Sequence, residues 1–135
     1  MREAVSLQKI YKQYKGRADF WWVYIREAHP TDSSRPARHV QIEQPKTFLR
    51  RKEVAGQCSS GLNLSIPCVV DDMKDTVARA FDAMPDRLYI INKEARIAFK
   101  GGRGPRNFSV KEMEDALRAL LGKKEDADKN RASSP

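Results

Sequence analysis

The chain has 135 residues, of which 40% are hydrophobic and 33% charged, so we expect one domain around a single core. Its net charge of +8 favours an anionic partner, but Lys and Arg are spread through every segment without a DNA- or RNA-binding signature, which argues against nucleic acid. Two cysteines without zinc spacing exclude a disulfide framework and predict no metal site, and no apolar run could span a bilayer, so we expect a cytoplasmic protein without a membrane partner.

The first half of the chain alternates between helical and strand patterns. Apolar residues at helical spacing from Leu7 to Tyr14 predict an amphipathic helix that ends near Gly16. The aromatic and β-branched run at 20–25 predicts a strand buried on both faces. A loop without periodicity follows at 29–44, and its length suggests a functional or mobile segment. Pro45 suits the first position of a helix, which we predict to run to about Cys58.

The second half continues the alternation and ends differently. The pattern predicts a strand at 64–70, followed by a helix that Asp71 and Asp72 cap and Pro85 breaks. Strands at 87–91 and 96–99 should then form an antiparallel hairpin, and the capping box at 109–112 should begin the last helix. Gly122 is placed to end that last helix. We therefore predict one domain over residues 1–122 and a disordered charged tail over 123–135.

This order of elements is typical of an α/β layer that ends in a hairpin and a helix, as in thioredoxin-like folds. His29 follows the carboxyl end of the strand at 20–25, which is the edge where open α/β sheets usually bind ligands. The alternative is that His29 only closes the strand end through hydrogen bonds. The sequence predicts His29 as the first candidate for a functional side chain.

Five blocks of the sequence resemble the iodothyronine deiodinase family, most closely its bacterial, peroxiredoxin-like members. They lie at 24–32, which contains Glu27-Ala28-His29, and at 44–47, 67–73, 85–91 and 99–105. The resemblance extends over residues 7–121 and implies a thioredoxin fold. It also implies redox chemistry with a small-molecule substrate, because animal members of the family remove iodine reductively from thyroid hormones. They use a selenocysteine that is cysteine in many bacterial relatives, with no bound cofactor and an external thiol reductant.

The resemblance also implies roles for particular residues. Glu27 and His29 fall on the family's active-site motif, where the histidine would bind substrate or manage a proton. Pro85 falls on the cis-proline that lies against the substrate in thioredoxin-like folds; the alternative is an ordinary trans helix breaker. Cys68 is a candidate resolving thiol, although structural burial is the simpler interpretation of both Cys58 and Cys68.

The chain also departs from the family pattern. Ser33 follows Asp32 where the family has glycine. Pro45 stands in place of a second histidine, which His39 does not cleanly replace. The family's nucleophile would precede the first helix, where this chain has no such residue. We therefore expect an α/β, thioredoxin-like fold that lacks the first, nucleophile-bearing strand and turn, from a truncated chain that is inactive as given. Unpaired strand edges would then favour homo-oligomers. The alternatives are a peroxiredoxin-like thiol peroxidase and a non-catalytic basic binding module.

Overall fold

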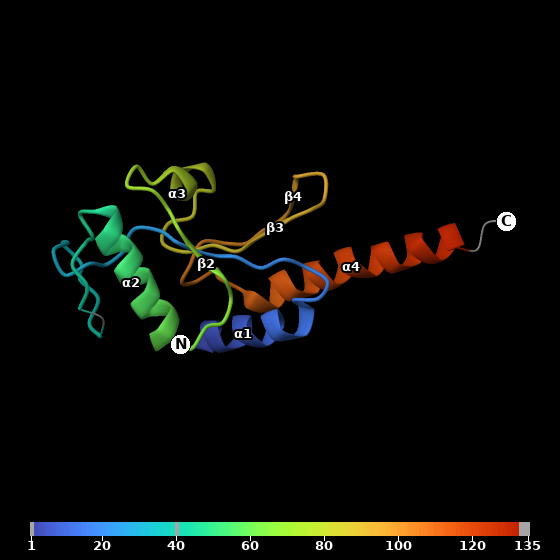
Figure 1. Ribbon diagram of the computed structural model, residues 1–135, viewed down its shortest axis with the longest axis horizontal. Coiled ribbons are helices and arrows are strands. Elements are labelled where there is room, and N and C mark those ends of the chain that lie inside the picture. The colour runs from blue at the N-terminus through green and yellow to red at the C-terminus, as the bar shows by residue number, and fades with distance from the viewer. Residues whose placement is uncertain (1, 40, 133–135) are drawn as a thin grey trace. The chain divides into compact units, whose positions relative to one another are not determined.

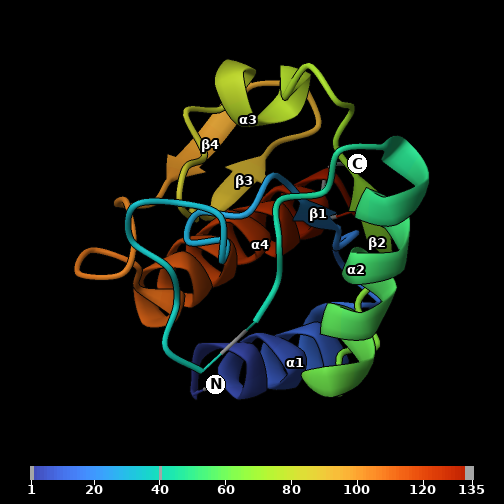
Figure 2. The same ribbon diagram turned by 90° about the vertical axis from the view of Figure 1, so that its left-hand side faces the viewer.

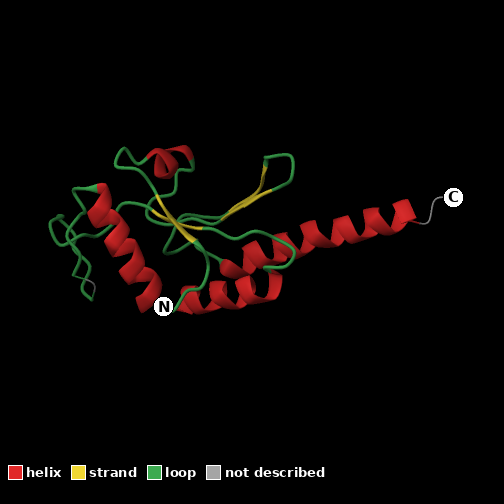
Figure 3. Cartoon of the chain, viewed as in Figure 1, coloured by secondary structure: helices red, strands yellow, loops and turns green. Residues whose placement is uncertain are grey.

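The computed structural model describes residues 2–39 and 41–132, and the chain divides into two units, the first ending at Asp86 and the second beginning at Arg87. Helices and strands alternate and then give way to a hairpin and a final helix, in the order that the sequence predicted (Figures 1 and 3). The elements are α1 (Arg2–Tyr14), β1 (Trp22–Tyr24), α2 (Phe48–Gly61), β2 (Cys68–Val70), α3 (Thr76–Ala80), β3 (Tyr89–Ile91), β4 (Ile97–Lys100) and α4 (Val110–Ala132). The chain is thus an α/β protein, and none of its described helices is long and apolar enough to cross a membrane.

The first unit is built on a two-stranded parallel sheet. β1 and β2 pair with Trp22 opposite Cys68 and Tyr24 opposite Val70. One face of this sheet packs on α2, which lies beside both strands (Figure 2). The centre of that core comprises buried residues of β1 and α2, surrounded by partly buried ones: Tyr24, Val54 and Ala55, with Trp22, Ile42, Cys58 and Val70 around them.

The other face of this sheet is exposed, so the prediction of a strand buried on both faces was wrong. The exposed fractions are 65% for Trp21, 37% for Val23 and 40% for Val69. An aromatic and β-branched run reports strand propensity, but it does not report how many faces are covered. Within the described residues, β1 has only β2 as a neighbour.

Two helices of this unit differ from the predicted bounds. Helix α2 begins after Thr47, whose Oγ1 accepts a hydrogen bond from the Arg50 amide at 3.2 Å, so Pro45 precedes the helix and is not its first residue. A threonine cap satisfies an otherwise free amide, which proline cannot do. Helix α3 ends at Ala80, before Pro85, because Asp82 takes a positive φ of 47° that ends helical geometry.

The second unit contains the predicted antiparallel hairpin. Tyr89 pairs with Lys100 and Ile91 with Ile97. The turn is closed by Asn92, whose Oδ1 accepts hydrogen bonds from the amides of Glu94 and Arg96 at 3.1 and 2.9 Å. This side chain takes the place of a backbone acceptor, as asparagine commonly does in turns.

Helix α4 follows the hairpin. Its first turn is capped as predicted, since the Glu112 amide donates to Ser109 Oγ at 3.2 Å. The side chains buried on this helix recur at helical spacing, at Val110, Met113, Leu117 and Leu121. The predicted end at Gly122 was wrong, because α4 continues to Ala132 through part of the predicted tail. Lys, Glu, Asp and Ala dominate that extension, and most of these are good helix formers; residues 133–135 lie outside the described part.

Candidate functional site at the carboxyl edge of the parallel sheet

The end of β1 carries a tyrosine–carboxylate pair. Tyr24 is buried, with 7% of its surface exposed, and its hydroxyl donates a hydrogen bond to Glu27 Oε1. Burial first, and then this contact with Glu27, raise the pKa of Tyr24 well above its ordinary value, so the phenol stays protonated as a donor. The predicted site residue Glu27 is thereby fixed just beyond the strand.

Gln44 holds the backbone around Glu27 from the far end of the loop. Its Oε1 accepts from the Glu27 amide at 3.1 Å, and its Nε2 donates to the Glu27 carbonyl at 3.0 Å. Its own amide donates to Asp32 Oδ1 at 3.0 Å, and the Thr31 amide donates to the Ile42 carbonyl at 2.9 Å. The long loop between β1 and α2 is therefore tied together by hydrogen bonds across its base.

His29 is exposed in this loop and held in one orientation. Its Nδ1 lies 3.0 Å from the Arg35 carbonyl, which can only accept, so Nδ1 carries the hydrogen. The His29 carbonyl in turn accepts from the Ala37 amide at 3.0 Å. Among the described residues Nε2 has no hydrogen-bond partner. The ring therefore presents to solvent a nitrogen that accepts a proton when the imidazole is neutral and donates one when it is charged.

The end of β2 is built from buried charge. Asp71 is 2% exposed, and its carboxylate accepts from the amides of Asp72, Val77 and Ala78, each at 2.9 Å. Asp72 accepts from the amide and hydroxyl of Thr76, and these hydrogen bonds, the hydroxyl contact first, lower the pKa of Asp72. The prediction that these two carboxylates cap the following helix is confirmed.

Arg51 connects these ends of the two strands, and the sequence analysis did not identify it. This arginine of α2 is 2% exposed. Its Nη1 donates to the carbonyls of Asp71 and Asp72 and, at 3.0 Å, to Asp75 Oδ1. Arg26, just after β1, approaches Asp75 Oδ2 at 3.6 Å. The sequence pointed to Arg51 only through its spacing, since it lies three residues before Val54 and four before Ala55 and so falls on the same, buried face of the helix.

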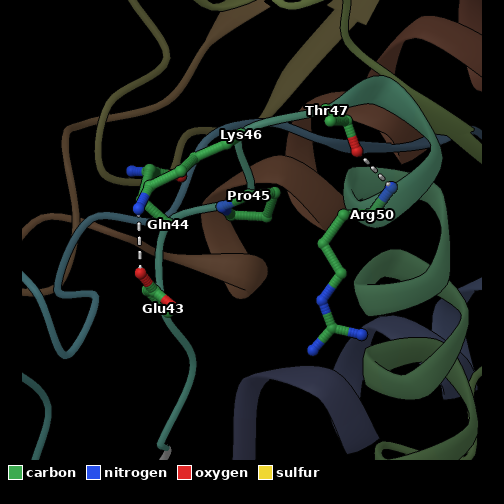
Figure 4. Close-up of a pocket in the computed structure, with 6 residues that line it drawn as sticks. All are labelled: Glu43, Gln44, Pro45, Lys46, Thr47 and Arg50. Atoms are coloured by element: carbon green, nitrogen blue, oxygen red, sulfur yellow. Dashed lines mark hydrogen bonds and ion pairs between the residues drawn. The ribbon is translucent and has the colours of Figure 1, made fainter.

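The remaining candidates lie elsewhere in the first unit. The Met84–Pro85 bond is cis, as the resemblance implied, and Pro85 is partly buried. Pro45 is buried and His39 exposed. A shallow pocket of about 290 Å³ lies where the loop enters α2 (Figure 4), and its lining consists of Glu43, Gln44, Pro45, Lys46, Thr47 and Arg50. Both basic side chains there are engaged, Lys46 with Glu43 and Arg50 with Glu53, each at 3.0 Å.

The cysteines do not lie at the carboxyl end of the sheet. Cys68 opens β2 opposite Trp22, whereas His29 follows the end of β1. Cys68 is exposed, so the expectation that it is buried was wrong; Cys58 is half-buried on α2. Burial first, and then the charges of Glu27 and Cys68, raise the pKa of the Cys58 thiol. No cluster of three metal-ligating side chains occurs in the part of the chain that the structure describes.

Comparison with known proteins identifies relatives over most of the chain. The family model described as "Iodothyronine deiodinase" matches residues 1–124. A thyroxine 5-deiodinase of Sparus aurata is 33% identical over 87% of this chain and 43% of its own length. A type I iodothyronine deiodinase of Xenopus laevis is 30% identical over 80% of this chain and 42% of its own. The chain thus spans less than half the length of these relatives.

Proposed function

Because the chain belongs to the iodothyronine deiodinase family, we propose that it carries the histidine side of a thiol- or selenol-dependent oxidoreductase centre in a thioredoxin-like fold. The order of elements supports this fold, since a parallel pair of strands is followed by an antiparallel hairpin and a closing helix. The centre lies at the carboxyl edge of the β1–β2 sheet, where α/β proteins bind their ligands.

The orientation of His29 carries this proposal. Replacing a carbon-bound halogen by hydrogen consumes two electrons and a proton and releases halide. The electrons come from a thiol or selenol and, in turn, from an external thiol reductant. The proton requires an acid at the substrate, and an exposed imidazole with Nδ1 held by the Arg35 carbonyl and Nε2 available meets that need. Glu27, which Tyr24 and Gln44 hold in place, anchors the loop on which His29 lies.

Neither cysteine of this chain is the nucleophile of that centre. Attack on a substrate requires a thiolate, and burial of Cys58 raises the pKa of its thiol. Cys68 begins β2, whereas His29 lies in the loop beyond the opposite end of the neighbouring parallel strand. The 135-residue chain alone should therefore bind a small aromatic substrate without dehalogenating it.

Substrate binding by the purified chain tests this function. We expect thyroxine to quench the fluorescence of Trp21, which is 65% exposed, or of Trp22. We expect His29→Ala to weaken binding roughly tenfold, about the loss of one hydrogen bond. His39→Ala is the matched control, because His39 is an exposed histidine of the same loop and should leave binding unchanged. Equal affinity of the two variants, or no binding by the unmodified chain, would overturn the proposal.

Turnover tests the assignment of the cysteines. With dithiothreitol as reductant, we expect no iodide release from thyroxine above the rate with reductant alone. Release that Cys58→Ser or Cys68→Ser abolishes would show that one of these thiols is the nucleophile after all. Release that survives both substitutions together would show that the chemistry needs no cysteine of this chain.

A further inference from the structure

We propose that Cys58 and Cys68 form a second redox site, a dithiol that closes reversibly into a disulfide between α2 and β2. This site is separate from the one around His29 and does not depend on the proposed function. The two residues are the only cysteines in the sequence, and both are free thiols. The inference rests on how α2 lies along the sheet.

The two cysteines share one side of the sheet. Trp22, which is opposite Cys68, and Val70, two residues further along β2, both pack on the core formed with α2. Because side chains alternate along a strand, Cys68 points to the same face as Val70. Cys58 is itself part of that packing, three residues beyond Ala55 and four beyond Val54 on the same helical face.

The position along the strand also matches. Arg51, in the first turn of α2, reaches the carbonyls of Asp71 and Asp72 at the end of β2, whereas the last turn of α2 leads through a short connection to Cys68 at the start of β2. The helix and the strand therefore run in opposite directions. From Arg51 to Cys58 the helix advances about 10 Å, at 1.5 Å per residue. From Asp71 back to Cys68 the strand advances about the same distance, at 3.3 Å per residue. Cys58 therefore lies over Cys68, and the effect of the Cys68 charge on the pKa of Cys58 agrees with this proximity.

The exposed fractions of the two thiols indicate which one reacts first with an oxidant and which one then closes the disulfide. Exposed Cys68 is accessible to an oxidant such as a peroxide, whereas half-buried Cys58 is shielded. The Cys68 thiolate attacks the peroxide, an S–O bond forms as the O–O bond breaks, and water leaves after protonation. The Cys58 sulfur then attacks this sulfenic acid, the S–S bond forms as the S–O bond breaks, and the Cys58 proton leaves with the hydroxyl as water. The dithiol loses two electrons, peroxide becomes two waters, and a thiol reductant reverses the bond by exchange.

Small residues flank Cys58 and leave room for closure. A disulfide requires the two Cα atoms to lie within about 7 Å of each other. Gly56 and Gly61 stand on either side of Cys58, and a Cβ added at either would meet no atom within 4 Å. Ala55 and Cys58 pack on the core, whereas Gly56, Gln57, Ser60 and Gly61 are exposed, so few contacts of this half of α2 would resist an approach of the two thiols.

Peroxide treatment of the 135-residue chain, followed by mass spectrometry, tests the proposal. Trypsin leaves both cysteines in one peptide, residues 53–74, so the disulfide appears as a loss of two hydrogens that a thiol reductant restores. Chymotrypsin can cut after Leu62 or Leu64, and the two halves of that peptide should then stay joined until reduction. We expect a monomer in which both free thiols are lost together.

A register swap is the matched control. The pair of substitutions Cys68→Val and Val69→Cys keeps the composition but moves the thiol to the opposite face of β2. We expect this variant to form the internal disulfide at least roughly tenfold more slowly than the unmodified chain, because the thiols no longer face each other. In Cys58→Ser, Cys68 should advance to sulfinic acid or form dimers between chains. Only dimers or overoxidised Cys68 in the unmodified chain, or equal rates in the swapped variant, would overturn the proposal.

Discussion

The ends of β1 and β2 lie at the same edge of one parallel sheet, yet they are built in opposite ways. β2 ends in buried charge, with Asp71 and Arg51 each 2% exposed and engaged with backbone groups. β1 ends in a loop whose base is held by Gln44 and whose tip leaves His29 exposed. Charge that is buried and paired fixes a structure, whereas a titratable ring held by one hydrogen bond remains available for chemistry.

This difference predicts that stability and function are separated along one edge of the sheet. Substitutions at the end of β2 should unfold the first unit and affect the site only as a consequence. Substitutions at the end of β1 should change the site while the fold persists. The following experiments test that separation, beginning with the largest expected effect on stability.

The largest effect should come from Arg51→Met. The substitution keeps much of the apolar volume but removes the partner of Asp75 and the donor to the carbonyls after β2. We expect the free energy of unfolding to fall by about 3 kcal/mol, as is typical when one member of a buried ion pair is lost. Urea denaturation followed by circular dichroism measures the change. Arg50→Met is the control, because Arg50 forms an exposed pair with Glu53 and should cost about 0.5 kcal/mol or less; equal losses would contradict the comparison.

A smaller effect should come from Gln44→Ala at the base of the β1 loop. The substitution removes both side-chain hydrogen bonds to the Glu27 backbone. We expect a loss of about 1–2 kcal/mol and faster hydrogen exchange at the Thr31 amide, which bonds across the loop to Ile42. Gln57→Ala, an exposed glutamine of α2, should leave both unchanged. An unaltered exchange rate at Thr31 would show that Gln44 does not hold the loop.

The sequence predicted the kinds of elements and their order better than it predicted their ends. Periodicity and turn residues report local preference, and they placed every helix and strand in order. The limits of the elements depended on particular local features. The Thr47 cap starts α2 after Pro45, and the positive φ of Asp82 prevents α3 from continuing to Pro85. Burial was harder still, because the run at 20–25 looks the same whether one face or two are covered.

For the candidate site, the motif around His29 located the edge, but not the residues that support it. Glu27 and His29 were predicted from their position after a strand and from the resemblance. Arg51 and Gln44 were not, because their roles arise from pairing across 20 and 17 residues of sequence, which no local pattern encodes. A buried arginine in a helix is also indistinguishable by sequence from an exposed one.

The pH dependence of stability offers a second test at the end of β2. Hydrogen bonds from Thr76 lower the pKa of Asp72 from its ordinary value of 3.8. Its contribution to stability is therefore present above that value and is lost as the pH falls through the lower pKa of the folded state. We expect Asp72→Asn to be less stable than the unmodified chain at neutral pH and the difference to shrink on acidification, as measured by urea denaturation at a series of pH values. A difference that is independent of pH would show that Asp72 acts without its charge.

The smallest effect on stability should come from His29→Ala, and it decides whether the end of β1 is a site or a strand cap. His29 is exposed, and its ring makes one hydrogen bond, to the Arg35 carbonyl, which solvent can replace. We expect a change within about 0.5 kcal/mol in the free energy of unfolding, the usual range for exposed positions. If His29 instead closed the strand end, as the alternative interpretation held, its loss would cost as much as that of Gln44. Comparing His29→Ala with Gln44→Ala in the same denaturation experiment separates the two roles, because a histidine with only a structural role must lower the free energy of unfolding when it is removed.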